Sequence, residues 1–274
     1  GITMRRIIKD TDDGDDMIND LIYIQVVWSD GNIEEISQIY LDDEPIESSL
    51  FDADDGGRWV YHFDYVNGET ARLSHPSHDD IVFESKGYSY SIIRLEYSTK
   101  KMNHIPKITA DIKGLKVTPV GGGAKVYSDN YADILNDYLT DDVYGRGLSN
   151  DRINQQRLID EKAFCSTLVY PYADSPSYQP LLSCNIRLDG NNTLLSNLNK
   201  ILQGCRGFLP YIDGQFHFII ERERTPLSTF EITDSNRMSN FIINDVDVKS
   251  YYNKVIVRFN DRAQKGKLAN AEYP

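Results

Sequence analysis

One glycine-rich segment has a composition that could bind phosphate. Gly121-Gly-Gly-Ala-Lys125 places a lysine after three glycines. A phosphate-binding loop needs the spacing GxxxxGK[ST], so that backbone N–H groups and the lysine both face the phosphates. Val126 follows Lys125, and the glycines do not have that spacing. We therefore expect an ordinary flexible loop.

Two acidic segments, Asp10–Asp16 and Asp52–Gly57, could bind calcium. An EF-hand loop has alternating oxygen ligands, glycine at its sixth position and glutamate at its twelfth. Neither segment has both of these residues at those positions. We expect mobile, solvated loops that bind cations adventitiously at most, and no metal site.

The histidines and cysteines form no catalytic signature. His75 and His78 are the only close pair of histidines, and they lie in a proline-containing loop without an HExxH helix. We expect exposed loop histidines; the five are His62, His75, His78, His104 and His217. No GxSxG segment is present. The sequence therefore nominates no catalytic, cofactor-binding or metal-binding residue, and we expect that the protein is not an enzyme.

The three cysteines, Cys165, Cys184 and Cys205, are odd in number, widely spaced and outside any CxxC motif. This pattern favours small buried thiols in a reducing compartment over a disulfide framework or a zinc site.

The charge of the chain is large and uneven. The 274 residues have a formal net charge of −13, and 40% of them are hydrophobic, which is ordinary for a globular protein of about two domains. Residues 1–80 hold 20 acidic and five basic side chains, whereas residues 81–274 hold 22 and 24. The negative balance argues against a protein that coats nucleic acid or docks on anionic membranes. No apolar run is long enough to span a membrane, and no signal peptide opens the sequence.

Hydrophobic periodicity predicts strands first and helices later. Alternating and β-branched runs predict strands at Leu21–Trp28, Ile33–Leu41, Arg58–Val66 and Ser89–Tyr97, with a hairpin turn at Asn67-Gly68. Helical spacing predicts three helices: one over Tyr131–Leu139 with Ser128 or Asp129 as N-cap, one after Asn150 that carries Ile153 and Leu158, and one over Leu194–Cys205 capped by residues 191–193. A hairpin over Phe208–Ile220 turns at Asp213-Gly214, and Tyr251–Phe259 is another strand.

The order of several short motifs resembles the central tail-hub proteins of long-tailed bacteriophages, the family of the lambda tip attachment protein J. The motifs are the Ala132-Asp-Ile-Leu-Asn-Asp-Tyr-Leu139 helix with Tyr144-Gly-Arg-Gly147, Cys184-Asn185, Leu198-Asn-Lys-Ile201 with Arg206-Gly207 and Asp213-Gly214, and Val255-Ile-Val-Arg-Phe-Asn-Asp261. The stretch from Tyr23 to Asp43 is similar to a further family region. The resemblance covers about residues 20–262. Asn130-Tyr131 replaces the usual Asn-Pro, and Glu35 stands where glycine is common.

The resemblance implies an α+β, β-rich fold with small β-barrel-like or β-sheet domains and a helix-containing α+β domain. We expect an acidic β-rich hub domain at residues 1–108 and an α+β hub domain with three helices and a β-hairpin at 109–235. Residues 236–274 would begin a further β domain that continues in a longer protein. The large C-terminal receptor-binding part of such proteins is absent from the sequence.

The resemblance also implies a structural role in the virion tail tip. Such a hub closes the tail tube, connects it to host-attachment parts and opens for DNA ejection. The expected assembly is a homotrimer that contacts the distal tail ring, the tail tube and the tape-measure protein. DNA would pass without specific binding, and no cofactor or membrane span is expected. The protein would be made in the cytoplasm of the bacterial host.

Two questions remain open at this point. The acidic loops of residues 10–55 are expected to face the lumen of the tube or a basic partner, since like charge keeps DNA from adhering. A carbohydrate-binding β-module, suggested by Trp59, Tyr61 and Tyr65, and a tail-associated cell-wall hydrolase are the alternative functions. Core and interface packing is the ordinary role of such aromatic residues.

Overall fold

The computed structural model describes residues 2–8, 21–53, 57–66, 71–75, 78–83, 86–96, 103–170, 176–223, 233–239, 252–261 and 267–273. These residues belong to two units, 1–222 and 223–274. The predicted division at residues 108 and 235 stays a prediction. The acidic segment Asp10–Asp16 and the Asn67-Gly68 turn lie outside the described residues.

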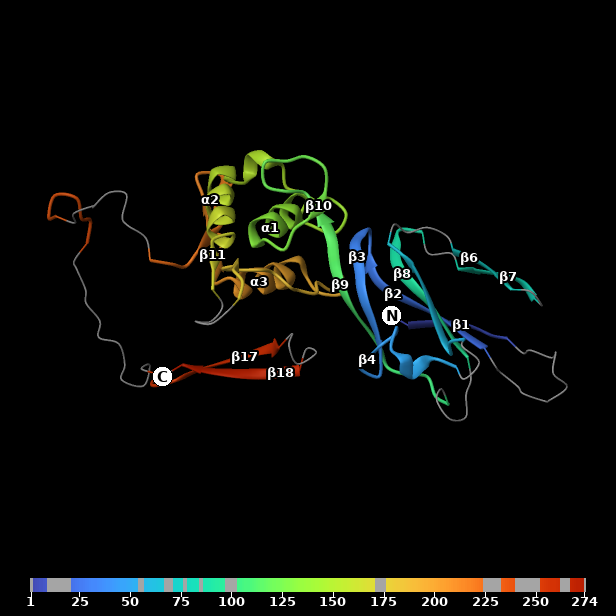
Figure 1. Cartoon of the computed structure of the whole chain (residues 1–274). Coiled ribbons are helices and arrows are strands. Elements are labelled where there is room, and N and C mark those ends of the chain that lie inside the picture. Colours follow the sequence, from blue (N-terminus) through green and yellow to red (C-terminus); the bar gives the residue numbers. More distant parts are fainter. Residues whose placement is uncertain are drawn as a thin grey trace. The chain divides into compact units, whose positions relative to one another are not determined.

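Two four-stranded antiparallel sheets are built from the first half of the chain (Figure 1). The first has the order β1 (Ile2–Ile8), β2 (Leu21–Asp30), β8 (Tyr88–Glu96), β5 (Val60–Tyr65). The second has the order β10 (Val126–Tyr127), β9 (Ile108–Val117), β3 (Ile33–Leu41), β4 (Glu44–Pro45). The four strands predicted between residues 21 and 97 are therefore confirmed.

The two sheets share one hydrophobic core. Alternation along each strand places every second side chain on the inner face, and both sheets contribute buried residues to the same cluster. Its members are Ile24, Val26, Ile39, Leu41, Ile46, Val60, Ile93, Leu95 and Ile108. The described strands do not close into a barrel.

Five further strand pairs are short hairpins or bridges. They are β6 (Ala71–His75) with β7 (His78–Phe83), β11 (Leu168–Val169) with β12 (Gln179–Pro180), β13 (Gly207–Phe208) with β16 (Ile219–Ile220), β14 (Tyr211–Ile212) with β15 (Gln215–Phe216), and β17 (Val255–Asp261) with β18 (Lys267–Tyr273). Since β5 pairs with β8 and β6 pairs with β7, the strands before and after Asn67-Gly68 are not partners. The turn predicted at Asn67-Gly68 itself lies outside the described residues, whereas the hairpin at Asp213-Gly214 is confirmed.

Three α-helices follow the sheets: α1 (Tyr131–Thr140), α2 (Gln155–Cys165) and α3 (Leu194–Gly204), with 3-10 turns at Ser49–Phe51 and Asn150–Arg152. All three predicted helices are confirmed, but one cap is not. Asn130 caps α1 through its side-chain oxygen and the Ala132 N–H, whereas Ser128 donates to Asp133. Asn154 is the N-cap of α2, so Ile153 lies before the helix and not in it as predicted. Its backbone forms an isolated bridge with Phe216.

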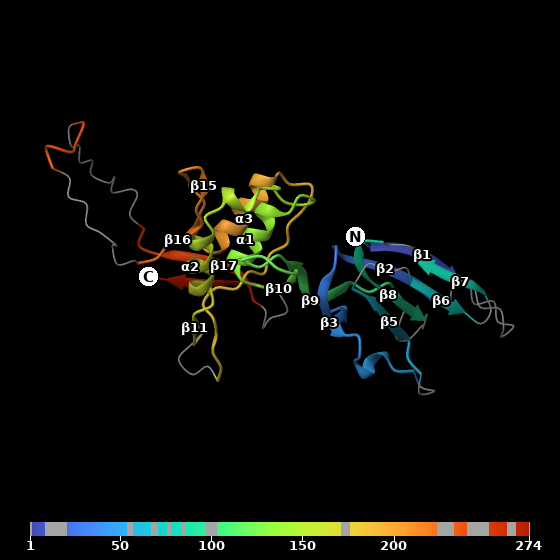
Figure 2. The ribbon, with the colours of Figure 1, turned by 90° about the horizontal axis from the view of Figure 1, so that it is seen from above.

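The helices and the β13–β16 pair surround a second core. Figure 2 shows α1 and α3 close together, with β16 beside α2. The core contains Tyr131, Ala132, Leu135, Tyr138, Leu139, Ile153, Leu158, Cys165, Cys184, Ile201, Cys205, Phe218 and Ile220. The fold is thus α+β and β-rich, as expected.

Candidate functional site

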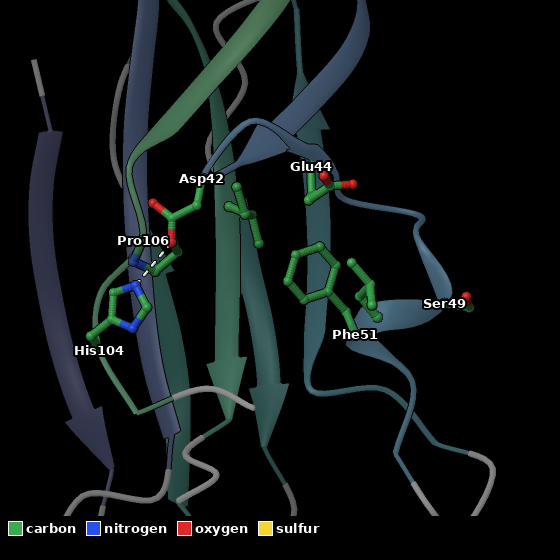
Figure 3. Close-up of a pocket in the computed structure, with 8 residues that line it drawn as sticks. Asp42, Glu44, Ser49, Phe51, His104 and Pro106 are labelled. Atoms are coloured by element: carbon green, nitrogen blue, oxygen red, sulfur yellow. Dashed lines mark hydrogen bonds and ion pairs between the residues drawn. The ribbon is translucent and has the colours of Figure 1, made fainter. Parts of the chain in front are cut away.

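A pocket of about 360 Å³ lies beside the turn between β3 and β4. The turn consists of two residues, Asp42 and Asp43, with φ of 49° and 68°. A type I′ turn in a two-residue hairpin has positive φ at both positions, and aspartate tolerates this conformation better than most residues. The turn brings Asp42 and Glu44 to opposite sides of the pocket (Figure 3).

Asp42 fixes one wall of the pocket. Its carboxylate accepts the backbone N–H of Lys107 at 2.8 Å and contacts Nε2 of His104 at 2.9 Å. These two contacts hold the pKa of Asp42 below its ordinary value, with the backbone N–H the larger cause. The segment before β9, including Pro106, is thereby tied to the turn.

The 3-10 turn Ser49–Phe51 forms the opposite wall. Ser48 caps it by accepting the Leu50 N–H. Arg58 donates to the carbonyl groups of residues 46–48 and pairs with Asp52 at 3.2 Å, which secures the segment from both ends. Leu50 is 58% exposed, so this wall offers apolar surface to solvent.

The sequence nominated no residue of this pocket for binding, although it noted His104 as a loop histidine. Each lining residue is unremarkable alone, and segments 60 residues apart meet here only because β3 pairs with β9. The one local signal is Asp42-Asp43-Glu44-Pro45, which directly follows the strand predicted at Ile33–Leu41.

A cluster of polar side chains surrounds His62 on β5. Its Nδ1 lies 3.2 Å from Asp64 and its Nε2 lies 3.4 Å from Glu47. Asp64 in turn accepts the Ser91 hydroxyl at 2.5 Å, and Ser91 accepts the Trp28 indole N–H at 2.7 Å. These bonds connect β2, β8 and β5 with the segment after β4. His62 is thus a partnered residue and not a solitary loop histidine.

His75, His78 and His217 have backbone contacts within the described residues. His75 and His78 pair across the β6–β7 turn at the level of the backbone. The backbone N–H of His217 bonds to the Pro210 carbonyl.

Lys125 is engaged within the protein. Its Nζ lies 2.7 Å from Asp141 and 3.7 Å from Asp137, and it contacts the Tyr144 hydroxyl at 3.2 Å. Two carboxylates of the same fold thus lie beside this ammonium group. The expectation of no phosphate-binding loop stays a prediction.

Three carboxylates follow one another at intervals of four residues: Asp133 and Asp137 on α1, and Asp141 at its C-cap. Asp133 accepts the Val120 N–H at 2.8 Å and the Lys162 ammonium at 2.9 Å. Asp137 accepts the Thr118 N–H and the Tyr144 hydroxyl. The i, i+4, i+8 spacing of aspartates was visible in the sequence, and its role as an anchor for residues 118–128 was missed.

The three cysteines are buried and free, as predicted. They belong to the core of the helices, where Tyr131 contacts Cys184. Burial raises the pKa of Cys165 and Cys184 to about 12 and that of Cys205 to about 11. Neutral thiols of this kind are not nucleophiles.

The aromatic residues suggested for sugar binding contact other side chains of the protein. Trp59 packs against the core of the two sheets. The Arg94 guanidinium lies 4.0 Å over the Tyr61 ring, and Tyr65 stacks on Tyr90 at 5.0 Å. The ordinary packing role expected of these aromatic residues agrees with these contacts, and the carbohydrate-binding alternative stays a prediction.

Within the described residues, no group of three histidine, cysteine or acidic side chains could hold a metal ion. In the second acidic segment, Asp52–Gly57, the described residue Asp52 forms an ion pair with Arg58. No helix in the described part of the chain is long and apolar enough to cross a membrane.

Comparison with known proteins gives one informative similarity. No family model matches the sequence. The chain is 24% identical over 170 residues to the "Baseplate hub protein pb3" of Escherichia phage T5. The chain is similar to a phage baseplate hub protein. The alignment covers 55% of this chain and 18% of the relative, so the chain spans less than a fifth of the length of that protein.

Proposed function

We propose that the chain is a structural component of a bacteriophage tail tip, part of its central hub, and that it performs no chemical step. The similarity to the T5 baseplate hub protein carries this proposal. The order of motifs along residues 20–262, which resembles the J family of tail hubs, supports the same role.

The motif residues have architectural roles, which agrees with a scaffold. Asn130 caps α1 and also donates to the Lys162 carbonyl and the Ser166 hydroxyl, which connects α1 to α2. Cys184 and Ile201 lie in the core of the helices. These three motif residues thus support the packing of the helices, as we expect of a scaffold.

The proposed assembly is a homotrimer that contacts the distal tail ring, the tail tube and the tape-measure protein. Exposed apolar side chains are candidates for such contacts, since large apolar patches mark interaction sites. Leu195 is 65% exposed, Phe208 56% and Tyr211 54%. In the second unit, the β17–β18 register pairs alternate apolar residues across the two strands, so that they share one face of the hairpin. The pairs are Val255 with Tyr273, Val257 with Ala271 and Phe259 with Ala269.

The acidic surface is partly neutralised within the fold. Glu35 on β3 pairs with Lys113 on β9 at 2.9 Å, and Glu34 pairs with Lys116 at 3.2 Å. The proposal of a DNA-repelling lumen therefore depends on the acidic residues of the segments 10–16 and 52–55, and less on β3. We propose that these acidic residues face the passing DNA or a basic partner.

Immunogold electron microscopy of particles from the encoding phage or prophage tests the location. Label at the distal end of the tail is the expected result, and label on capsids or absence from purified particles contradicts the proposal. Light scattering tests the assembly, with a mass three times the 31.3 kDa of the chain expected. Clearing of peptidoglycan in a zymogram would contradict the absence of a chemical step.

A further inference from the structure

The pocket beside the β3–β4 turn is lined mostly by apolar side chains. Leu41 is 1% exposed, and Leu50, Phe51 and Pro106 complete the apolar surface. Ligand pockets span about 300–1,000 Å³, and this one is near the lower limit. It therefore suits one long side chain of a partner better than a cofactor.

One carboxylate of the pocket contacts no basic side chain within the described part of the chain. Asp42 is paired with His104, and Asp43 is paired with Lys107 at 3.6 Å. Among the described residues, Glu44 has no ion-pair partner within 4 Å, and its side chain lies at the rim beside Phe51 (Figure 3). A carboxylate beside an aromatic ring and an apolar floor is complementary to a cation with an apolar stem.

Arginine fits this combination better than lysine. Its planar guanidinium forms two parallel hydrogen bonds with a carboxylate, stacks on an aromatic ring and is weakly hydrated. A lysine ammonium is a strongly hydrated point charge and loses more by entering an apolar pocket. Phe51 offers the ring and Glu44 the carboxylate.

We propose that this pocket receives an arginine side chain presented by a partner protein. The stem would lie on Leu41 and Pro106, and the guanidinium would lie between Glu44 and Phe51. The inference adds a binding site to the proposed structural role and does not depend on it, because the chemistry of the pocket is the same in any assembly.

The test is a titration of the full chain with N-acetyl-arginine amide, followed by ¹H–¹⁵N NMR. A single side chain is expected to bind with a Kd on the order of 1 mM. The shifts should be largest at Leu41, Phe51 and His104. N-acetyl-lysine amide should bind several-fold more weakly, and the neutral citrulline analogue should produce no saturable shift.

Two variants assign the binding to the proposed groups. Glu44→Gln should weaken arginine binding about tenfold, since it removes a charge-assisted hydrogen bond. Phe51→Leu should abolish the preference for arginine over lysine. The matched control Asp30→Asn, at an exposed carboxylate outside the pocket, should bind like the unaltered chain. Equal binding of arginine and citrulline, unaltered binding in Glu44→Gln, or shifts outside the pocket would overturn the proposal.

Discussion

Thr118 donates its backbone N–H to the Asp137 carboxylate at 2.7 Å, which fixes the end of β9 to the middle of α1. The Asp137 side chain is almost fully buried, and it also accepts the Tyr144 hydroxyl. One carboxylate thus secures the chain before α1 and the chain after it. Buried charges are stable in proteins only when such partners are present.

Replacement of this carboxylate by Asp137→Asn should lower the free energy of unfolding by about 2–3 kcal/mol. The amide keeps one acceptor oxygen, but it turns an NH₂ group toward donors and leaves Lys125 with one carboxylate fewer. Urea denaturation measures the change, which should shift the midpoint and leave the dependence of the unfolding free energy on urea concentration unchanged. Asp142→Asn, at the exposed neighbouring aspartate, is the control and should change the stability by less than about 0.5 kcal/mol. Equal effects of the two variants would contradict the anchoring role.

Gly145 packs against the end of α1 too closely for a side chain. A Cβ there would lie 2.3 Å from the Tyr138 carbonyl oxygen and 2.7 Å from that of Asp141. Both atoms are backbone and cannot move without distorting the helix. Gly145→Ala should therefore cost about 2 kcal/mol or more and lower Tm by several degrees. Gly190→Ala is the matched control, because a Cβ there meets nothing within 4 Å. A calorimetric scan that finds Gly145→Ala as stable as the control would refute this packing.

The sequence predicted the elements better than their connections. The strands at residues 21–41 were clear because β-branched residues alternate there, and α3 was clear because its apolar stripe repeats at helical spacing. The cap of α1 was predicted wrongly, since Ser128, Asp129 and Asn130 are all good capping residues. Only the three-dimensional path of the chain decides which of them bonds to the helix.

Pairings between distant segments could not be predicted in the same way. Counting charge by sequence window separated the acidic residues 1–80 from the rest, yet Glu35 and Lys113 meet across β3 and β9. The pocket also depends on this pairing, because it brings His104 to Asp42. A single sequence contains no information on strand register across 60–80 residues.

The buried thiols should resist alkylation in the folded protein. Burial is the largest cause that raises the pKa of Cys165, and the thiolate is the reactive species. Iodoacetamide at pH 8 should modify no cysteine of the native chain and all three in urea, as counted by mass spectrometry. Ser235→Cys, at an exposed position, is the control and should react quickly. Rapid labelling of a native cysteine would show that the core of the helices opens.

His62 should titrate above its ordinary range. Contact with the Asp64 carboxylate is the largest cause that raises the pKa of His62, and Glu47 adds to it. A raised folded pKa means that this stabilisation is complete below the unfolded value of about 6.5 and is lost as the pH rises through the folded value. NMR titration of the His62 ring should show the higher pKa, and stability should fall slightly across that interval.

Variants of the two carboxylates separate their effects on His62. Asp64→Asn should lower the pKa of His62 the most and still accept the Ser91 hydroxyl, whereas Glu47→Gln should lower it less. The contribution to stability should be below about 1 kcal/mol, since the pair is partly exposed. An unchanged pKa in Asp64→Asn would show that the contact is not formed in solution.

Glu161 is completely buried, and its carboxylate forms an ion pair with Arg222 at 3.2 Å. The Arg222 guanidinium also lies 3.8 Å from the centre of the Phe164 ring. Arg222→Met should lower the free energy of unfolding by about 3–5 kcal/mol, because the glutamate loses its counter-charge in an apolar site. The double variant Glu161→Gln with Arg222→Met should recover much of this loss, since no uncompensated charge remains. Denaturant unfolding of the single and double variants measures both values, and a single variant no less stable than the double one would show that the ion pair does not form.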